Sequence, residues 1–325
     1  MDLTPAALRK LRHALLTWYD AHGRDLPWRG DADPYRVWLS EIMLQQTRVA
    51  AAVDHYARFL HKFPTVQTLA TAREPSVLAV WSGLGYYHRA RRMHQAAKLV
   101  VRQRKGIFPR TAADWRALPG VGRYTAAAIA SIAFGEAVAV VDGNVERVLG
   151  RVFGAAKGRE AAWQQAEFLL DRQRPGDFNQ AMMELGATVC TPRAPQCPVC
   201  PLHTWCASRG AQSAPPQSIR KRKQLTYGLA RRNGLVLLVQ RPADASLMAG
   251  MYELPALSDV QRNGDQPLAM LRHSITDTDY DVSVFTVPRG KLRKLEVNAR
   301  WFVRRQWERL PLTGLARKIL RRLPD

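Results

Sequence analysis

The sequence predicts two domains of different class, a mainly α-helical domain followed by a smaller α+β domain. Apolar residues recur at helical spacing through residues 1–185. A segment rich in Pro, Ser, Gly and basic residues covers 209–223, and strand-like alternation begins only after residue 220. A chain of 325 residues is long enough for two compact domains. We therefore expect a helical domain over 1–208, a linker over 209–223 and a second domain over 224–325.

Helix signals follow one another through the first domain. Thr-Pro at 4–5 predicts the start of a first helix, whose apolar stripe stops before Gly23. Asp-Pro at 33–34 predicts the start of a second helix. Further helical patterns lie at about 50–62, 75–82, 88–104, 123–134, 145–153 and 160–172.

Strand and turn signals dominate the second domain. Residues 225–230 and 235–240 are predicted as two strands joined around Asn233-Gly234, which is a strong hairpin signal. Further strands are expected at 281–287 and 297–303, and a terminal helix at 315–323.

The charge of the chain predicts a polyanionic partner. The sequence has 49 Lys and Arg against 27 Asp and Glu, a net charge of +22. Residues 1–219 and 220–325 each carry half of this excess, so it is not a basic tail on a neutral protein. Nucleic acid is the favoured partner over an anionic membrane, although a basic composition alone can also reflect solubility or codon use.

Composition excludes several classes of protein. With 46% apolar residues the chain can bury substantial cores, which excludes wholesale disorder. No stretch approaches the roughly 20 uncharged apolar residues that a membrane-spanning helix needs. The N-terminal segment carries Asp2 and Asp20 and is not a signal peptide. We expect a monomer in the cytoplasm, associated with the nucleoid if the source is bacterial, with no membrane partner.

All four cysteines lie close together near the end of the helical domain. They are Cys190, Cys197, Cys200 and Cys206, spaced C-x6-C-x2-C-x5-C. Their confinement to one short segment excludes a disulfide scaffold and indicates one metal site, since thiolates favour zinc, copper(I) and iron–sulfur clusters. Only one half of the spacing fits the short knuckles of structural zinc sites. The uneven spacing favours a structural [4Fe–4S] cluster that fixes a basic loop, with zinc as the alternative.

A glycine turn and a following aspartate form a second candidate site. Gly120, Val121 and Gly122 lead into an Ala-rich helix, so backbone N–H groups at its start are free to bind a phosphate oxygen. Taken alone, the motif could also be a plain helix–helix turn. Asp142 follows an apolar run and precedes Gly143, a position typical of a helix start. An isolated Asp there would be a helix cap and nothing more.

Several motifs together resemble a known superfamily. LPGVGRYTA at 118–126, VVDGNVERVLGR at 140–151 and the cysteine spacing resemble the helix-hairpin-helix DNA glycosylases with an iron–sulfur loop. Four further stretches resemble the MutY family of adenine glycosylases in particular. They are LPWR at 26–29, WLSEIMLQQT at 38–47, WSGLGYY at 81–87 and FNQAMMELG at 178–186.

This resemblance covers nearly all of 1–208. It is fainter in 220–325, where AGMYELP at 249–255 resembles the Nudix-like recognition domain of the family. The implied fold is a mainly α helix-hairpin-helix glycosylase with an iron–sulfur cluster loop, followed by a C-terminal α+β Nudix-like domain. The implied cofactor is a [4Fe–4S] cluster held by the four cysteines.

The implied activity is hydrolysis of the N-glycosidic bond of adenine mispaired with 8-oxoguanine or guanine in double-stranded DNA. Glu41 lies mid-helix among apolar residues, which raises the pKa of a carboxyl group; by resemblance it protonates N7 of the flipped adenine. Without the resemblance, Glu41 would be a solvated helix residue. Asp142 is expected to stay ionised and stabilise the sugar cation, with Asn144 orienting it. Tyr124 stands where strand-cutting relatives carry a Schiff-base lysine, which predicts a monofunctional enzyme.

The other predicted site residues also follow from the resemblance. Those expected to line the adenine pocket are Trp28, Arg29, Leu44 and Glu184, of which Trp28 and Leu44 could equally be core residues. Those expected to contact DNA are Gln45, Gln46, Thr47, Leu84, Tyr86, Gly120, Val121, Gly122, Ser274 and Thr276. Four of these correspond to family residues that insert into the duplex near the opposite base, namely Gln45, Gln46, Leu84 and Tyr86. Their insertion offsets the free energy of unstacking the target base.

The sequence departs from the family in one loop of the second domain. Relatives read 8-oxoguanine with Phe-Ser-His, where this chain has Ile275-Thr276-Asp277. Thr276 keeps a hydroxyl, but Asp277 brings a negative charge that is unfavourable near DNA unless Arg or Lys neutralises it. The second domain also lacks the Glu-rich metal-binding helix of catalytic Nudix enzymes, so we expect it to recognise DNA and not to hydrolyse nucleotides.

Three alternatives to adenine removal remain at this point. Relatives with Tyr at the position of Tyr124 include thymine glycosylases for T·G mismatches. A noncatalytic iron–sulfur DNA-binding protein and a zinc-stabilised nucleic-acid module are the others. The presence of both Glu41 and Asp142, together with the second domain, favours adenine removal. The sequence indicates no other repair protein as a partner.

Overall fold

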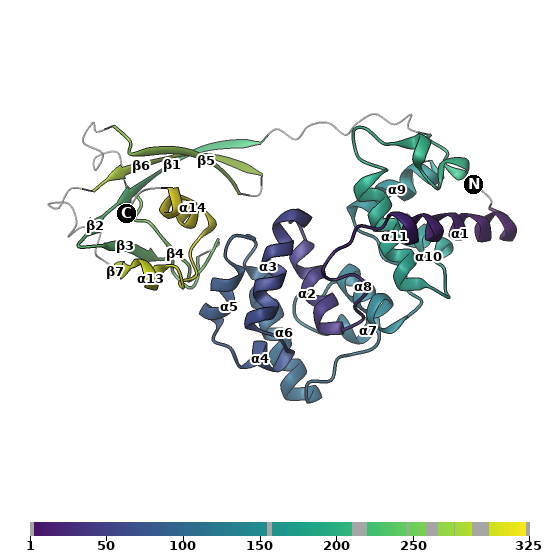
Figure 1. The fold of residues 1–325 in the computed structure, drawn as a ribbon, viewed down its shortest axis with the longest axis horizontal. Coiled ribbons are helices and arrows are strands. Elements are labelled where there is room, and N and C mark those ends of the chain that lie inside the picture. Colours follow the sequence, from purple (N-terminus) through teal and green to yellow (C-terminus); the bar gives the residue numbers. More distant parts are fainter. Residues whose placement is uncertain are drawn as a thin grey trace. The chain divides into compact units, whose positions relative to one another are not determined.

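The computed structural model describes residues 3–154, 158–209, 220–245, 247–257, 266–275, 277–287 and 299–322 (Figure 1). The chain divides into two compact units. The first unit comprises 1–60, 65–70 and 95–216, and the second comprises 61–64, 71–94 and 217–325. A short stretch of the helical region, 71–94, therefore packs with the C-terminal part of the chain. The predicted domain boundaries stay predictions.

The N-terminal part of the chain is helical, as predicted. Its helices are α1 (Pro5–His22), α2 (Pro34–Leu44), α3 (Val49–Lys62), α4 (Val66–Thr71), α5 (Glu74–Trp81), α6 (His88–Arg104), α7 (Ala112–Trp115), α8 (Arg123–Phe134), α9 (Gly143–Phe153), α10 (Arg159–Leu169) and α11 (Pro175–Thr188). Two short 3-10 helices follow, η1 (Cys197–Val199) and η2 (His203–Trp205). The helices α4, α7 and α11 were not among the predicted ones.

The predicted helix starts are made by side-chain caps. The Thr4 hydroxyl accepts a hydrogen bond from Ala7 N, and the Asp33 carboxylate accepts from the backbone of Tyr35 and Arg36. Each cap precedes a proline in the first turn, where the missing N–H would be unpaired in any case. These local signals explain why the ends of α1 and α2 could be predicted from the sequence.

The core of the first unit positions α8, α9 and α11. Helices α1, α9, α10 and α11 contribute large apolar side chains to one cluster, which also takes in the 139–141 segment before α9. Every residue of α8 from Thr125 to Ser131 is buried. Most of these residues are alanine, so neighbouring helices can approach α8 closely. Helix α11 also lies close to α9, because a Cβ on Gly186 would come within 2.7 Å of Asn144 Cβ.

The second unit contains two small sheets. In one, β1 (Lys221–Leu229) pairs in parallel with β6 (Thr278–Thr286), which pairs antiparallel with β5 (Ala269–Ile275). In the other, β3 (Leu235–Gln240) pairs antiparallel with β2 (Arg231–Arg232), β4 (Tyr252–Glu253) and β7 (Ala299–Val303). Two helices follow, α13 (Arg304–Trp307) and α14 (Gly314–Arg322), and α14 lies between the two sheets (Figure 1). Apolar residues of α14 share a core with both sheets.

The hairpin prediction is correct for the turn and wrong for one of its strands. Asn233 and Gly234 have φ values of 48° and 73°, the left-handed pair that such a turn needs. The strand across the turn from β3 is the two-residue β2, whereas β1 pairs along its whole length with β6. Pairing with a strand about 57 positions away cannot be read from the turn, which specifies only its immediate neighbours.

Other predicted segments differ from the structure at their ends. Residues 221–223, predicted as linker, are the first residues of β1. Residues 210–219 of the predicted linker, 297–298 of the predicted strand and residue 323 of the predicted helix lie outside the described residues. In the part of the chain that the structure describes, no helix is long and apolar enough to cross a membrane.

Candidate active site and cysteine cluster

Glu41 lies on the buried face of α2 and bonds to the side chain of Tyr124. Only 6% of Glu41 is exposed, which contradicts a solvated helix residue. The Tyr124 hydroxyl, one residue into α8, donates a 2.6 Å hydrogen bond to Glu41 Oε2. Burial raises the pKa of Glu41 to about 7, partly opposed by this hydrogen bond and assisted by the charge of Asp142. Glu41 can therefore hold or release a proton near neutral pH.

Asp142 begins α9 and has a different environment. Its Oδ1 accepts from Val145 N at 2.7 Å, and its Oδ2 accepts from Asn144 Nδ2 at 3.1 Å. The side chain is half-buried. These two donors fix the orientation of the carboxylate at the start of the helix. The charge of Asp142 contributes to the raised pKa of both Glu41 and Tyr124, so the three groups share one electrostatic neighbourhood.

Glu184 on α11 is buried and paired with two arginines. Arg24 Nε donates to its Oε1 at 2.6 Å, and Arg29 Nη2 donates to its Oε2 at 2.5 Å. Burial works to raise the pKa of Glu184, but the two guanidinium groups outweigh it and hold the pKa below its ordinary value. Glu184 is thus a buried, ionised acceptor. Arg24 was not predicted, and nothing in its local sequence sets it apart from the other loop arginines.

The remaining predicted pocket residues lie between α1 and α2 and at the end of α2. Trp28, next to Arg29, is 7% exposed, and its ring meets that of Tyr56 edge-on at 5.2 Å. Leu44 is half-buried and ends α2, about one turn after Glu41. Arg29 also lies over the Tyr19 ring at 5.3 Å. The segment 24–29 therefore brings two arginines to Glu184 on α11, and Trp28 precedes the second of them in the sequence.

The glycine turn before α8 presents a helix start without a side-chain cap. Gly120 has a φ of 79°, and Gly122 is the cap residue of the twelve-residue α8. A Cβ on Gly122 would meet nothing within 4 Å, so the space in front of the helix is open. Val121 between them is buried. The backbone N–H groups at the start of α8 therefore have no side-chain cap, and the phosphate contact stays a prediction.

The turn after α2 is tight and exposed at one residue. Gln45 Nε2 donates to Thr125 Oγ1 on α8 at 3.1 Å. Gln46 is exposed with a φ of 56°, a conformation that few residues other than glycine adopt. Thr47 N donates back to Leu44 O at 3.2 Å. The hydrogen bonds of Gln45 and Thr47 therefore fix the backbone on both sides of Gln46, whose side chain is exposed to solvent.

In the second unit, three predicted DNA contacts lie around one hollow. Its lining includes Leu84 and Tyr86 of the 82–87 loop, Met248 and Ser274. The Ser274 hydroxyl donates to Asp279 Oδ1 at 2.6 Å. Asp277 has a cation beside it, because Lys221 Nζ lies 3.2 Å from its Oδ2 in an exposed ion pair. Hydrogen bonds from Thr278 and Lys221 hold the pKa of Asp277 below its ordinary value. Thr276 lies outside the described residues.

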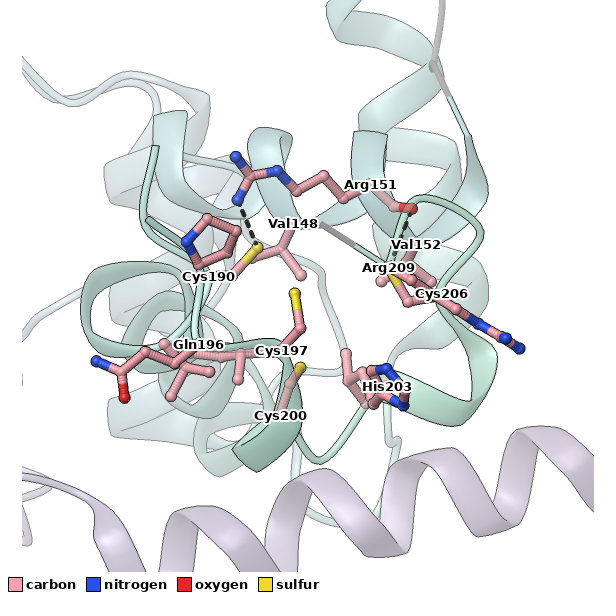
Figure 2. Close-up of a pocket in the computed structure, with 14 residues that line it drawn as sticks. Val148, Arg151, Val152, Cys190, Gln196, Cys197, Cys200, His203, Cys206 and Arg209 are labelled. Atoms are coloured by element: carbon pink, nitrogen blue, oxygen red, sulfur yellow. Dashed lines mark hydrogen bonds between the residues drawn. The ribbon is translucent and has the colours of Figure 1, made fainter. Parts of the chain in front are cut away.

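The four cysteines line one cavity and are half-buried free thiols (Figure 2). Arg151 of α9 reaches both ends of the cysteine segment. Its Nη1 donates to Cys190 Sγ at 3.2 Å, and its carbonyl oxygen accepts from Cys206 Sγ at 3.3 Å. Among the described residues, no three His, Cys, Asp or Glu side chains are arranged to hold a metal ion. Four thiols that line one cavity form a donor set that an iron–sulfur cluster can take, with one cysteine to each iron.

Arg147 connects the cysteine segment to Asp142. Its Nε donates to the Cys190 carbonyl at 2.8 Å, and its Nη2 donates to Asn144 Oδ1 at 2.9 Å. The same Nη2 donates to the Gly186 carbonyl on α11 at 2.6 Å. Since Asn144 donates to Asp142, an unbroken chain of hydrogen bonds runs from Cys190 to the candidate catalytic carboxylate. The sequence analysis did not identify Arg147.

Comparisons with known proteins find related sequences and folds. The model of the family described as "HhH-GPD superfamily base excision DNA repair protein" matches residues 39–170. The human adenine DNA glycosylase is 51% identical over 219 residues, which cover 63% of this chain and 40% of the human protein. The mouse adenine DNA glycosylase is 40% identical over 331 residues, which cover 82% of this chain and 64% of the mouse protein. The chain thus spans less than two thirds of the length of either relative.

Solved structures share the helical fold. A thermostable thymine-DNA glycosylase matches with a TM-score of 0.60 and 30% identity, covering 65% of this chain and all of that one. An endonuclease III trapped on DNA matches with a TM-score of 0.56 at 22% identity, over 65% of this chain and 99% of the other, a likeness in fold alone.

Proposed function

Because the chain belongs to the HhH-GPD superfamily of base excision DNA repair proteins, and within it to the MutY type, we propose that it removes adenine from mispairs in double-stranded DNA by hydrolysing the N-glycosidic bond. One observation carries the proposal. Glu41 is a buried carboxyl group with its pKa raised to about 7, and it shares an electrostatic neighbourhood with the hydrogen-bonded carboxylate of Asp142. Two carboxyl groups in such different environments are what glycosidic hydrolysis requires.

The two carboxyl groups take complementary roles. Protonated Glu41 donates to the leaving adenine, at N7 as in the MutY family, and its carboxylate then helps activate water. Tyr124 keeps Glu41 in position through its hydroxyl. Asp142 faces the oxocarbenium-like sugar as an anion, and Asn144 fixes its orientation. Tyr124 has no amine to form a Schiff base with the sugar, so the enzyme is monofunctional.

Adenine recognition is assigned to the residues around Glu184. Adenine presents an amino donor beside a ring-nitrogen acceptor. The ionised Glu184 accepts hydrogen bonds, while Arg24 and Arg29 donate them, so the cluster offers both partners. Trp28 offers an aromatic surface beside Arg29, and Leu44 offers an apolar one next to Glu41.

The partner is double-stranded DNA carrying adenine opposite 8-oxoguanine or guanine, bound by one copy of the chain. The turn of Gly120, Val121 and Gly122 is assigned to a backbone phosphate. The residues assigned to contacts with the distorted duplex are Gln45, Gln46, Thr47, Leu84 and Tyr86. Contact with the opposite base is assigned to Ser274 and Thr276. The Lys221–Asp277 pair supports a Nudix-like recognition role for the C-terminal domain, because the lysine partly offsets the negative charge that would repel DNA.

A [4Fe–4S] cluster is the proposed cofactor. Cys190, Cys197, Cys200 and Cys206 would each hold one iron. When bound, the cluster supplies a rigid anchor for the loop after α11. Arg151 and Arg147 are the residues that join this loop to α9 and so to Asp142.

Thymine removal from T·G mismatches is the second candidate. Its support is the 30% identity to a thymine-DNA glycosylase along the whole of that protein. It has less support, since the adenine DNA glycosylases of human and mouse are 51% and 40% identical to this chain.

Single-turnover excision separates these candidates. Matched duplexes would contain A·8-oxoguanine, A·G, A·C, T·G or A·T, with strand breaks measured before and after alkali. The proposal expects loss of adenine that is fastest opposite 8-oxoguanine, with breaks only after alkali. Asp142→Asn should abolish excision while preserving DNA binding. Loss of thymine alone, or undiminished excision by this variant, contradicts the proposal.

A further inference from the structure

The loop between α5 and α6, residues 82–87, has an unusual backbone. Gly83, Gly85 and Tyr86 have φ values of 111°, 71° and 46°. A tyrosine in the left-handed region is uncommon and persists only where its surroundings hold it. The loop carries Leu84 and Tyr86, the two side chains proposed to enter the duplex.

Neighbouring residues in α5 and α6 hold the centre of this loop. Arg89 is 5% exposed, and its Nη2 donates to the carbonyls of Leu84 and Gly85 at 3.3 Å each. Trp81 Nε1 donates to the Gly85 carbonyl at 3.1 Å. The Arg89 guanidinium also lies over the Trp81 and Tyr86 rings, 5.4 and 5.5 Å from their centroids. These contacts are local in sequence and support the turn from one side.

A second set of contacts comes from the far end of the chain. The Ser82 hydroxyl donates to the Leu312 carbonyl at 2.6 Å and accepts from Arg317 Nε at 3.0 Å. The Tyr87 hydroxyl donates to the same carbonyl at 3.3 Å. Gly83 N in turn donates to the Tyr87 hydroxyl at 3.4 Å. Both ends of the loop, Ser82 and Tyr87, are therefore bonded to one carbonyl oxygen.

The carbonyl that receives these bonds is itself fixed. Tyr252 N in β4 donates to the Pro311 carbonyl, and Thr313 N donates back to the Tyr252 carbonyl, both at 2.9 Å. Leu312 between them is fully buried, as are Ser82 and Tyr87 to within 6%. Arg317 lies on α14, whose apolar face belongs to the core of the second unit. The C-terminal segment is thus a rigid support.

We propose that Leu312 and Arg317 form a latch with Ser82 and Tyr87 that positions the 82–87 loop for insertion into DNA. Through this latch the C-terminal segment assists extrusion of the target base from any mispair. This role is distinct from recognition of the base opposite the target. Ser82, Tyr87 and Arg317 are positioning residues in this role. The inference rests on the proposed function for its substrate, because the duplex that the loop enters is the one that carries the mispaired adenine.

The latch hypothesis and the hypothesis that the C-terminal segment only recognises the opposite base predict different selectivity between duplexes. If the C-terminal segment acts only on the opposite base, weakening it slows excision opposite 8-oxoguanine and leaves A·C duplexes unaffected. If it holds the inserting loop, weakening it slows both by the same factor. The ratio of the two rates is therefore the decisive quantity, and a general loss of folding is excluded by comparing unfolding temperatures.

The test uses the full-length, cluster-containing protein with Arg317→Ala, Arg317→Lys and Ser82→Ala. Arg321→Ala is the matched control, because Arg321 is an exposed residue of the same helix. Two quantities are measured on A·C and A·8-oxoguanine duplexes. One is the single-turnover rate, and the other is the fluorescence of 2-aminopurine placed beside the mispair, which increases when the stack opens.

We expect Arg317→Ala and Ser82→Ala each to lower both quantities about tenfold on both duplexes, as the loss of a buried hydrogen-bond partner does. The double variant should be no worse than the more affected single variant, since both changes break one contact. Arg317→Lys should retain part of the effect, and Arg321→Ala should match the wild type. Unchanged rates in both alanine variants, or a selective loss on A·8-oxoguanine, overturns the latch.

Failure of the proposed function can be told apart from failure of the latch. If the wild type removes no adenine but still opens the stack, and Arg317→Ala reduces that opening, then the latch stands and the assigned chemistry does not. If the wild type removes adenine and the variants open the stack as it does, then the latch is wrong and the chemistry stands.

Discussion

Replacing Glu41 by glutamine should stabilise the protein at alkaline pH while abolishing its activity. The raised pKa of Glu41, about 7 against an ordinary 4.5, means that the folded protein keeps a proton that the unfolded chain loses. Stability from this group is therefore complete below about pH 4.5 and is lost as pH rises through about 7. A difference of roughly 2.5 units corresponds to about 3 kcal/mol at about 1.36 kcal/mol per unit. At pH 8 the wild type carries this full penalty.

Glutamine has the same shape and no charge to desolvate, and its amide oxygen can still accept from Tyr124. Glu41→Gln should thus raise the free energy of unfolding by up to about 3 kcal/mol at pH 8 and by little at pH 4.5. Urea unfolding at both pH values measures this difference. Glu146→Gln, which changes an exposed glutamate of α9, is the control and should show no such pH dependence. An equal effect of Glu41→Gln at both pH values refutes the argument that Glu41 is strained by burial.

Four further outcomes follow from the site. The excision rate should fall about tenfold for each pH unit above about 7, because Glu41 must be protonated; a flat profile to pH 9 contradicts this. Tyr124→Phe removes a hydrogen bond to the ionised form of Glu41 and should move that fall upward by about one pH unit or more, as read from the same profile. Arg147→Ala should slow single-turnover excision about tenfold with unchanged DNA affinity, because Asn144 and the Cys190 carbonyl both lose their hydrogen-bond donor. Arg159→Ala, at the exposed start of α10, is the control variant. Equal rates in the two variants would contradict a role for the hydrogen bonds that join Cys190 to Asp142. Cys197→Ser should reduce bound iron and absorbance at about 400 nm together with the unfolding temperature, whereas zinc in place of iron in the wild type by elemental analysis contradicts the cluster.

Local signals made much of this fold predictable. The caps at Thr4 and Asp33 bond to backbone groups within three residues, so the sequence alone specifies where α1 and α2 begin. The same is true of the Asn233-Gly234 turn. The partner of β1 is a different matter, because parallel pairing with β6 depends on the whole second unit and not on any nearby residue.

The candidate site divides in the same way. Glu41 could be predicted to have a raised pKa because its apolar neighbours lie on its own helix. Arg24 and Arg147 could not be found, because what distinguishes each is a partner far along the chain. Glu184 is 160 positions from Arg24, and Cys190 is 43 positions from Arg147. A loop arginine and a helix arginine acquire their roles only when folding brings those partners to them.

The cap at the start of α9 has a consequence for mutations that remove activity without unfolding the protein. Asparagine caps a helix about as well as aspartate does, because the cap needs an oxygen acceptor and not a charge. The hydrogen bond from Val145 N to the side chain of residue 142 would survive Asp142→Asn, and the helix with it. Protein quality control would therefore have no misfolded chain to remove. On the proposed function, such an allele would yield a folded protein that binds mispairs without excising adenine and shields them from an intact copy, a dominant defect rather than a simple absence.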